Sequence, residues 1–290
     1  MKVVELSLRK LKSMPLLQLS NQIVNTEGRL YLYNHKDKWN YLKELIKIYY
    51  NQSDRYLADK MYIISELLVN RESIGMDELI LPTSLISLDG NISGFSMPFI
   101  ENNINMSLFL NNPKINIEQK IKYLKEIYMI LEKSMSIKAL EGKFFLGDIH
   151  EANFVLDIME QKIKAIDMDS AYINDSTVSI SKFLTCNANL EENFSKYPKD
   201  ENGNPIPNRN TTILSFIYML LNVLSGEKTS YRWTLDEYYK YLSYLSSKKV
   251  PLELLDALAN VYTNSEENNF EIEMLDEIDV RNNYTLKKSK

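Results

Sequence analysis

The sequence predicts a mixed α+β protein, with strands concentrated in the first hundred residues and helices dominating the remainder. Three observations support this prediction. Between residues 21 and 100, short apolar blocks are separated by turn sequences, which is the pattern of β-hairpins. After residue 115, apolar residues recur three and four positions apart, as they do on the buried face of a helix. Two short apolar runs within residues 144–166 interrupt this helical part and are typical of strands.

Composition and charge limit the class of protein. The 290 residues are 44% apolar and 25% charged, which is enough for a sizeable core under an ordinary charged surface. The net charge of −5 argues against a nucleic-acid-binding surface. A single cysteine, Cys186, leaves no internal disulfide, and two histidines beside it make no plausible zinc site. No apolar run is long enough to span a bilayer, and the charged N-terminus is unlike a secretory signal. We therefore expect a cytoplasmic protein with no membrane or nucleic-acid partner.

The first strands are expected between residues 21 and 50. A hairpin over residues 21–33 would turn at the polar residues 25–28, and a charged loop, residues 35–38, would follow it. The next apolar run, residues 45–50, holds Lys47 in its middle. A lysine inside an apolar strand is costly unless it is paired. Lys47 is therefore either an edge-strand residue that points to water or a functional group.

A helix and a second hairpin complete the first part of the chain. The helix is expected over residues 54–70, capped by Ser53 or Asp54. Strands over residues 83–88 and 92–100 are joined by an Asp-Gly turn, a strong hairpin signal. The residues that recur at helical spacing, and so predict the buried face of the helix, are Leu57, Met61, Ile64 and Leu68.

The second half is expected to be mainly helical. Asn116 can cap a helix with Gln119 at its third position, and an apolar face continues to Leu131. Residues 170–209 are polar and rich in proline, and they predict a long loop. Stretches of this length without regular structure are usually functional. The remaining helices are expected over residues 211–224, 235–245 and 251–262.

Residues 144–170 hold the residues most typical of a functional site. An apolar lead-in delivers Asp148, Asn153 follows five residues later, and a second short strand, residues 162–166, ends at Asp167. Two short strands closing a loop would bring these three side chains to one end of a hairpin. Phosphoryl transfer from a metal–nucleotide complex needs such a group, with one carboxylate to orient the attacking hydroxyl and hard oxygen ligands for magnesium.

This spacing resembles the catalytic loop and metal-binding motif of the protein-kinase-like superfamily. The sequence Gly147-Asp148-Ile-His150-Glu-Ala-Asn153 is closest to the Gly-Asp-x-His-x-x-Asn form found in aminoglycoside and choline kinases and in atypical bacterial and phage kinases. The resemblance implies a bilobal α+β fold. Its N-lobe, residues 1–100, would be an antiparallel sheet with one main helix, and its C-lobe, residues 101–290, would be mostly helical. The implied activity is ATP- and Mg²⁺-dependent phosphoryl transfer to an alcohol.

The resemblance also implies a role for each matching residue. Asp148 would orient the acceptor hydroxyl and accept its proton. Asn153 and Asp167 would bind Mg²⁺, and Lys47 would contact the α- and β-phosphates of ATP. His150 would brace the loop by hydrogen bonds, or it is simply a partly buried structural histidine.

Nucleotide contacts are implied at two further places. Gly28 matches the last glycine of the family's phosphate-covering loop, or it belongs to a plain hairpin; the other two glycines of that loop have no match. Met97 corresponds to the gatekeeper before the hinge between the lobes. Backbone groups of Pro98 and Ile100 would hold adenine, although proline offers only its carbonyl. The alternative is a buried strand end.

The helix over residues 54–70 should carry an acid that pairs with Lys47. Glu66 lies at a usual interval from that lysine, whereas the apolar pattern of the helix would place Asp59 or Lys60 at the pairing position. A lysine there would be a departure from the family's ion pair. The choice among the three is open.

Asp167 and Asp169 should differ in direction. If the strand continues beyond residue 166, alternation sends the two side chains to opposite sides. We then expect Asp167 to face the metal and Asp169 to face away, toward the segment that follows.

The acceptor is open. The resemblance favours a serine or threonine hydroxyl of a protein, and the alternative is a small-molecule hydroxyl, with the acidic run of residues 266–279 lining the acceptor pocket. A third possibility is a pseudokinase that binds or scaffolds, because the glycine loop is thin and Thr212 replaces the aspartate that normally braces the catalytic loop. No arginine precedes Asp148, so we expect residues 170–209 to need no phosphorylation.

Overall fold

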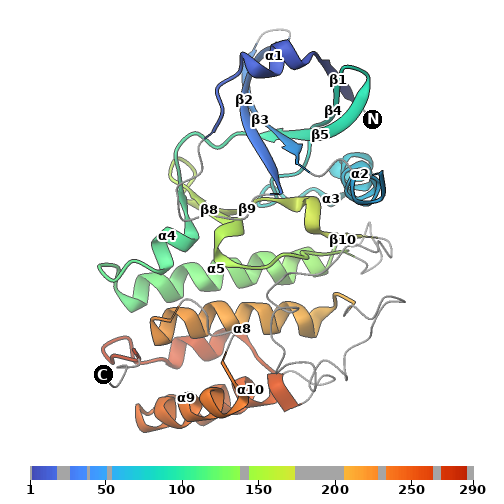
Figure 1. Ribbon diagram of the computed structural model, residues 1–290. Coiled ribbons are helices and arrows are strands. Elements are labelled where there is room, and N and C mark those ends of the chain that lie inside the picture. The colour runs from blue at the N-terminus through green and yellow to red at the C-terminus, as the bar shows by residue number, and fades with distance from the viewer. Residues whose placement is uncertain are drawn as a thin grey trace.

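The computed structural model describes residues 2–17, 27–37, 40–50, 54–137, 144–173, 206–227, 233–263 and 269–285. A curled sheet lies at one end of the molecule and a stack of helices at the other, as Figure 1 shows. The α+β class that the sequence predicts is thus confirmed. Most of the expected loop over residues 170–209, and Cys186 with it, lies outside the described residues.

The described strands of the N-terminal part form a five-stranded sheet in the order β1-β4-β5-β3-β2. The outer pair β1–β4 is parallel, and the other neighbours are antiparallel. Lys47 lies on β3, which is hydrogen-bonded to β2 on one side and β5 on the other. It is therefore not on an edge strand. The bounds are β1 Val3–Leu6, β2 Gly28–Asp37, β3 Asn40–Tyr49, β4 Ser84–Leu88 and β5 Asn91–Pro98.

The second expected hairpin is confirmed. Strands β4 and β5 are joined at Asp89 and Gly90, whose φ angles of 48° and 88° are both left-handed. Two consecutive left-handed residues are the geometry that an Asp-Gly turn favours, because the twist of that turn matches the twist of the strands. The turn chemistry alone therefore located this hairpin.

The first hairpin differs from the expectation. The strands that pair are β2 and β3, with Asp37 opposite Asn40, so residues 35–37 of the expected charged loop are strand. The chain before β2 meets it through an antiparallel bridge between Leu16 and Tyr31. Residues 21–26 of the expected hairpin lie outside the described residues. The charged side chains of the expected loop do not exclude a strand, because strand side chains can point to water from one face of a sheet.

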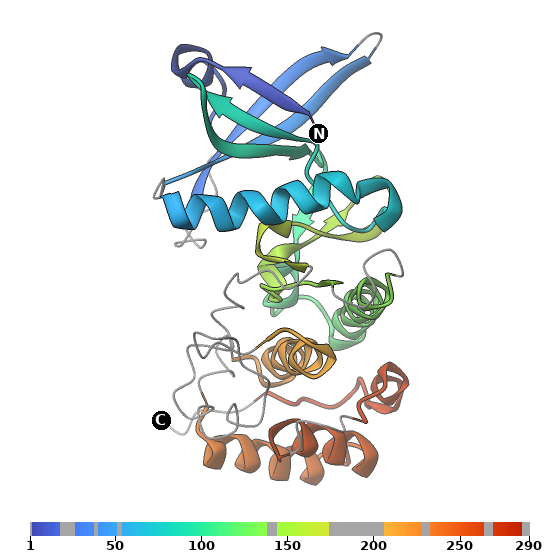
Figure 2. The same ribbon diagram turned by 90° about the vertical axis from the view of Figure 1, so that its right-hand side faces the viewer.

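Helix α2 (Asp54–Val69) lies between the sheet and the helical part, as Figure 2 shows. Ile64 is fully buried among the side chains of the sheet, while Ile63 and Leu67 are buried in the larger core of the C-terminal part. The helix therefore has two buried faces and connects both cores. A short helix, α3 (Arg71–Ile74), ends at Gly75 in the left-handed conformation.

The chain leaves β5 and enters the helical part through β6 (Asn103–Asn105) and α4 (Met106–Leu110). Helix α5 (Ile117–Met135) begins where Asn116 accepts a hydrogen bond from the Gln119 amide at 2.8 Å, as its sequence predicts. Beyond it come β7 (Phe144–Phe145), β8 (Phe154–Asp157), β9 (Lys162–Ala165) and β10 (Tyr172–Ile173). Strands β6, β8 and β9 form one small sheet, and β7 pairs with β10.

Helix α8 (Arg209–Ser225) occupies the centre of the helical part. Nearly all of its side chains are buried, as expected of a helix that is apolar all round. It packs against α5 on one side and α10 (Leu252–Thr263) on the other, and α9 (Leu235–Ser247) packs on α10. A 3-10 turn, η6 (Ile272–Glu277), lies against α5. In the part of the chain that the structure describes, no helix is both long and apolar enough to cross a membrane.

Candidate functional site

The loop between β7 and β8 is stabilised by its own polar residues. The side-chain amide of Asn153 donates to the main-chain carbonyl of Asp148 at 2.8 Å. His150 accepts a hydrogen bond at Nδ1 from the amide of Ala152 at 3.1 Å, and its Nε2 lies 3.3 Å from the Asp148 carboxylate. Because Nδ1 accepts, Nε2 carries the proton and donates to Asp148. His150 therefore braces the loop and orients the Asp148 side chain.

Gly147 lets this loop approach the segment that follows β9. A Cβ atom at this position would overlap the main-chain carbonyl oxygen of Ser170 and lie only 2.9 Å from its carbon. Any larger residue would push the two segments apart. The glycine therefore explains how Asp148 comes to lie beside the segment that carries Asp167.

Asp148, Asn153 and Asp167 line one pocket between these segments. The side chains of Asp148 and Asp167 remain 32% and 33% exposed, so both carboxylates can be reached from solvent. The structure thus brings together the three residues that the sequence singled out. Apolar residues form the rest of the wall, including Leu146, Ile149, Phe154, Ala165 and Met168.

The turn after β9 changes the expected directions of the two aspartates. The strand ends at Ala165, Asp167 has the left-handed angles φ 62° and ψ 51°, and residues 168–170 form a 3-10 turn. Alternation along a strand therefore does not apply here. Both Asp167 and Asp169 reach Lys47, and the expectation that Asp169 faces away is wrong.

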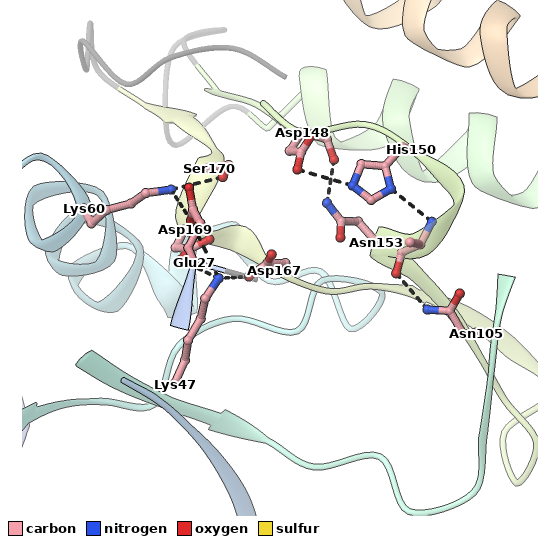
Figure 3. A network of polar contacts seen from close by, with 11 residues as sticks. Glu27, Lys47, Lys60, Asn105, Asp148, His150, Asn153, Asp167, Asp169 and Ser170 are labelled. Carbon is pink, nitrogen blue, oxygen red and sulfur yellow. Dashed lines mark hydrogen bonds and ion pairs between the residues drawn. The ribbon is translucent and has the colours of Figure 1, made fainter. Parts of the chain in front are cut away.

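Lys47 is the centre of a buried ionic cluster (Figure 3). Its ammonium lies 2.5 Å from Asp167 Oδ1, 2.9 Å from Asp169 Oδ2 and 3.9 Å from Glu27 Oε2. The hydroxyl of Tyr49, two residues along the same strand, donates to Asp169 Oδ2. These partners satisfy a lysine that is only 5% exposed.

The two aspartates respond differently to this cluster. Burial favours the neutral form of Asp169, but the charges of Lys47 and Lys60 and the Tyr49 hydroxyl outweigh it and hold its pKa well below the usual range. Burial and the neighbouring Asp169 charge raise the pKa of Asp167. Burial lowers the pKa of Lys47, but the two aspartates prevail and raise it. Asp169, which is fully buried and held by both Lys47 and the Tyr49 hydroxyl, is thus the fixed anion of the cluster.

Helix α2 contributes a lysine, not an acid, to this cluster. Lys60 is 4% exposed, and its ammonium lies 2.9 Å from Glu27 Oε2 and 3.2 Å from the Ser170 hydroxyl. Glu66 is not among the ion-pair partners described for Lys47. Glu66 comes six positions after Lys60, so the two residues lie about 9 Å apart along the helix axis and about 120° apart around it. Of the three candidates on this helix, Lys60 is the one that reaches the cluster.

The residues expected to contact adenine lie outside the cluster, and the structure gives them different surroundings. Met97 is buried with Ile64 and Phe95, between the sheet and α2. Pro98 ends β5, and the carbonyl of Ile100 accepts a hydrogen bond from the Asn103 side chain at 2.6 Å. This contact occupies part of the hydrogen-bonding capacity that Ile100 would offer to adenine.

Gly28 has a structural explanation of its own. It begins β2 opposite Tyr49, and a Cβ atom there would lie 2.8 Å from the carbonyl carbon of Ile48. Close packing of β2 against β3 therefore requires glycine at this position. Strand packing therefore explains the glycine, while the first part of the hairpin expected around it lies outside the described residues.

The oxygen atoms in the pocket suit a hard cation as ligands. Asn153 donates through its nitrogen, and Figure 3 shows its amide oxygen on the side of Asp167. One amide oxygen and one carboxylate are the kind of partial set by which proteins hold Mg²⁺ together with phosphate oxygens. Among the described residues, no group of three or more acids, histidines or cysteines could hold a metal by itself. An ion here would therefore need phosphate or water as further ligands.

Two members of the cluster were not foreseen from the sequence. Tyr49 lies two residues after Lys47, and strand alternation places both on one face, so this pattern could have identified it. Glu27 had no such signal, because it stands in a polar turn beside a glycine.

No model of a known protein family matches the chain, and a search of curated proteins found no match either. The function therefore has to be inferred from the site itself.

Proposed function

We propose that this chain is an ATP- and Mg²⁺-dependent phosphotransferase with a bilobal, protein-kinase-like fold. Residues 1–100 would form the N-lobe and residues 101–290 the C-lobe. One observation carries the proposal: buried Lys47, from the N-terminal sheet, reaches Asp167, and Asp167 lines the same pocket as Asp148 and Asn153. A cation for phosphates, oxygen ligands for magnesium and an exposed carboxylate are the groups that phosphoryl transfer requires.

Each group has a definite task in this proposal. The exposed carboxylate of Asp148, held by His150, would orient the acceptor hydroxyl and accept its proton. Asn153 and Asp167 would hold Mg²⁺, which would neutralise charge on the phosphates when it is bound. Lys47 would exchange its contact with Asp167 for phosphate oxygens.

The adenine would enter between the sheet and the helical part. Met97, which is buried between the sheet and α2, would form its apolar back wall, and Pro98 and Ile100 follow where the chain passes from one part to the other. The carbonyl of Pro98 and the amide of Ile100 are the backbone groups that we assign to it. Gly28, where β2 packs closely against β3, would be the glycine of the loop that covers the phosphates.

The acceptor is an alcohol, and a protein serine or threonine is the first choice. The small-molecule alternative depends on an acidic lining from residues 266–279. In the described part of this run, Asp276 pairs with Lys125 on α5, and no residue of the run lines the pocket with Asp148. The described part of this run therefore contributes no acidic wall to that pocket.

A nucleotide-binding module without catalysis is the second candidate. Thr212, at the position where an aspartate would brace the catalytic loop, is buried, and its hydroxyl has no hydrogen-bond partner among the described residues. Lys47 also occupies one oxygen of Asp167. Transfer of phosphate, tested below, separates this candidate from the enzyme.

Nucleotide binding is tested by thermal unfolding. A ligand at about 100 times its dissociation constant stabilises the folded state by about 2.7 kcal/mol. We expect Mg²⁺ and ATP together to raise the melting temperature by several degrees, and ATP with EDTA to raise it less. Lys47→Met should abolish the shift. The absence of any shift with millimolar Mg-ATP in the unmodified protein would contradict the proposal.

A further inference from the structure

Two buried lysines from different elements converge on one set of acids. Lys47 extends from β3 and Lys60 from α2, and both ammonium groups lie within 4 Å of the same oxygen of Glu27. A lysine in α2 cannot orient another lysine, because like charges repel. Some other residue must therefore hold Lys47 in position.

Asp169 has the properties that this task requires. Its side chain is 0% exposed, and one oxygen, Oδ2, receives both Lys47 at 2.9 Å and the Tyr49 hydroxyl. Asp169 is also not among the residues that line the pocket. Asp167, by contrast, is a third exposed and lines the pocket, so it is placed to exchange partners.

Lys60 completes the arrangement. An isolated buried carboxylate is costly, and removal of one partner from a buried ion pair leaves an uncompensated charge. When phosphate also shares the charge of Lys47, Asp169 needs another cation nearby to remain in place. Lys60 is buried, touches the hydroxyl of the adjacent Ser170 at 3.2 Å and shares one oxygen of Glu27 with Lys47.

We propose that Asp169, rather than an acid of α2, is the residue that positions Lys47 for the nucleotide phosphates, and that Lys60 supplies the charge that keeps Asp169 in place. This inference rests on the proposed function. It makes Asp169 and Lys60 positioning residues, which touch neither metal nor substrate. The acid that holds the phosphate-binding lysine would then come from the turn after β9.

The test is a double-mutant cycle between Lys47→Met and Asp169→Asn, with KM for ATP and kcat measured for each protein. Asp169→Asn should raise KM for ATP by about tenfold or more, which is the loss of one well-placed charged contact. The double variant should be no worse than Lys47→Met alone, because residues that act as a unit are not additive. Effects that multiply in the double variant would overturn the proposal.

Magnesium dependence separates positioning from metal binding. The Mg²⁺ concentration that gives half-maximal rate should be unchanged in Asp169→Asn and raised in Asp167→Asn. A raised Mg²⁺ requirement in Asp169→Asn would make Asp169 a metal ligand and overturn the proposal. Lys60→Met should raise KM for ATP in the same way as Asp169→Asn, and an unchanged KM would overturn the role given to Lys60.

A milder variant covers the case in which Asp169→Asn does not fold. Tyr49→Phe removes only a hydroxyl from Asp169, and it should raise KM for ATP by a smaller factor with Mg²⁺ dependence unchanged. The matched control is Tyr128→Phe, which removes a buried hydroxyl that donates to Glu132 at 3.1 Å on α5, away from the site. Tyr128→Phe should lower the melting temperature but leave KM for ATP unchanged. Equal KM values for Tyr49→Phe and Tyr128→Phe would overturn the proposal. If the unmodified protein binds no Mg-ATP, the proposed function itself fails.

Discussion

Replacement of Gly147 by alanine should separate the two halves of the site. The new Cβ would lie 2.9 Å from the carbonyl carbon of Ser170 and still closer to its oxygen, and real Cβ atoms essentially never approach below 3.0 Å. Ordinary carbon–carbon contacts are about 3.5–4.0 Å, so that carbon alone must move by at least about 0.6 Å. Both partners are backbone atoms between β7 and β10, which are paired. Overpacking of this kind costs about 1–3 kcal/mol, and we expect the upper end.

The loss of activity should exceed the loss of stability. Movement of Gly147 away from Ser170 moves Asp148 away from Asp167, and a misplacement of about 1 Å can reduce a rate by about 10²-fold. Urea unfolding gives the free energy of unfolding, and the phosphotransfer rate is then compared at a temperature where the variant is folded.

Gly90→Ala is the matched control for this prediction. A Cβ atom at Gly90 meets nothing within 4 Å, but the residue has a φ of 88°, so alanine introduces backbone strain without a clash. The control should be destabilised by about 1 kcal/mol and keep its full rate per folded molecule. The reasoning is refuted if Gly147→Ala loses less than about 1 kcal/mol and also keeps the full rate.

Three further predictions concern the proposed chemistry. Asp148→Ala should abolish transfer but preserve the rise in melting temperature with Mg-ATP, because in the proposed site this side chain would face the acceptor and not the nucleotide; loss of that rise in a folded variant would count against its role. Asp167→Asn should weaken ATP binding strongly when Mg²⁺ is present and only weakly in EDTA, since it removes a full charge from a hard-cation site; calorimetric titration of ATP with and without Mg²⁺ measures this, and equal losses in both conditions would argue against metal binding. Phosphatase treatment should leave activity unchanged, because Leu146 and Gly147, not an arginine, precede Asp148; a fall of tenfold or more would show that residues 170–209 require phosphorylation.

Several features of the fold could be predicted because a local chemical cost or preference identifies them. Lys47 stands in an apolar strand, where only pairing makes it tolerable, and the structure pairs it. The Asp-Gly turn and the Asn116 cap are local conformational preferences and needed no tertiary information. The two short apolar runs after Asn153 and before Asp167 predicted a pair of strands with these residues at one end, and β8 and β9 pair in this way.

Other features depend on geometry that sequence patterns do not contain. Asp169 was expected on the far side, because alternation holds only while a strand continues, and β9 ends at Ala165. The left-handed conformation of Asp167 is one that aspartate adopts more readily than most residues, but no pattern in the sequence placed it at this position. Lys60 could be named only as one of three alternatives. The position of α2 against the turn after β9 determines which residue reaches the cluster.

The most direct measurement of the central claim is transfer of phosphate from ATP. Purified protein is incubated with ATP labelled at the γ-phosphate, Mg²⁺ and cell lysate, and labelled products are separated into proteins and small molecules. The account predicts label in protein serine or threonine hydroxyls with the unmodified protein, and none above background with Asp148→Ala. Label in small molecules alone would move the acceptor to the alternative class. Equal labelling with both proteins, or none with either while Mg-ATP still binds, would contradict the claim that this pocket transfers phosphate.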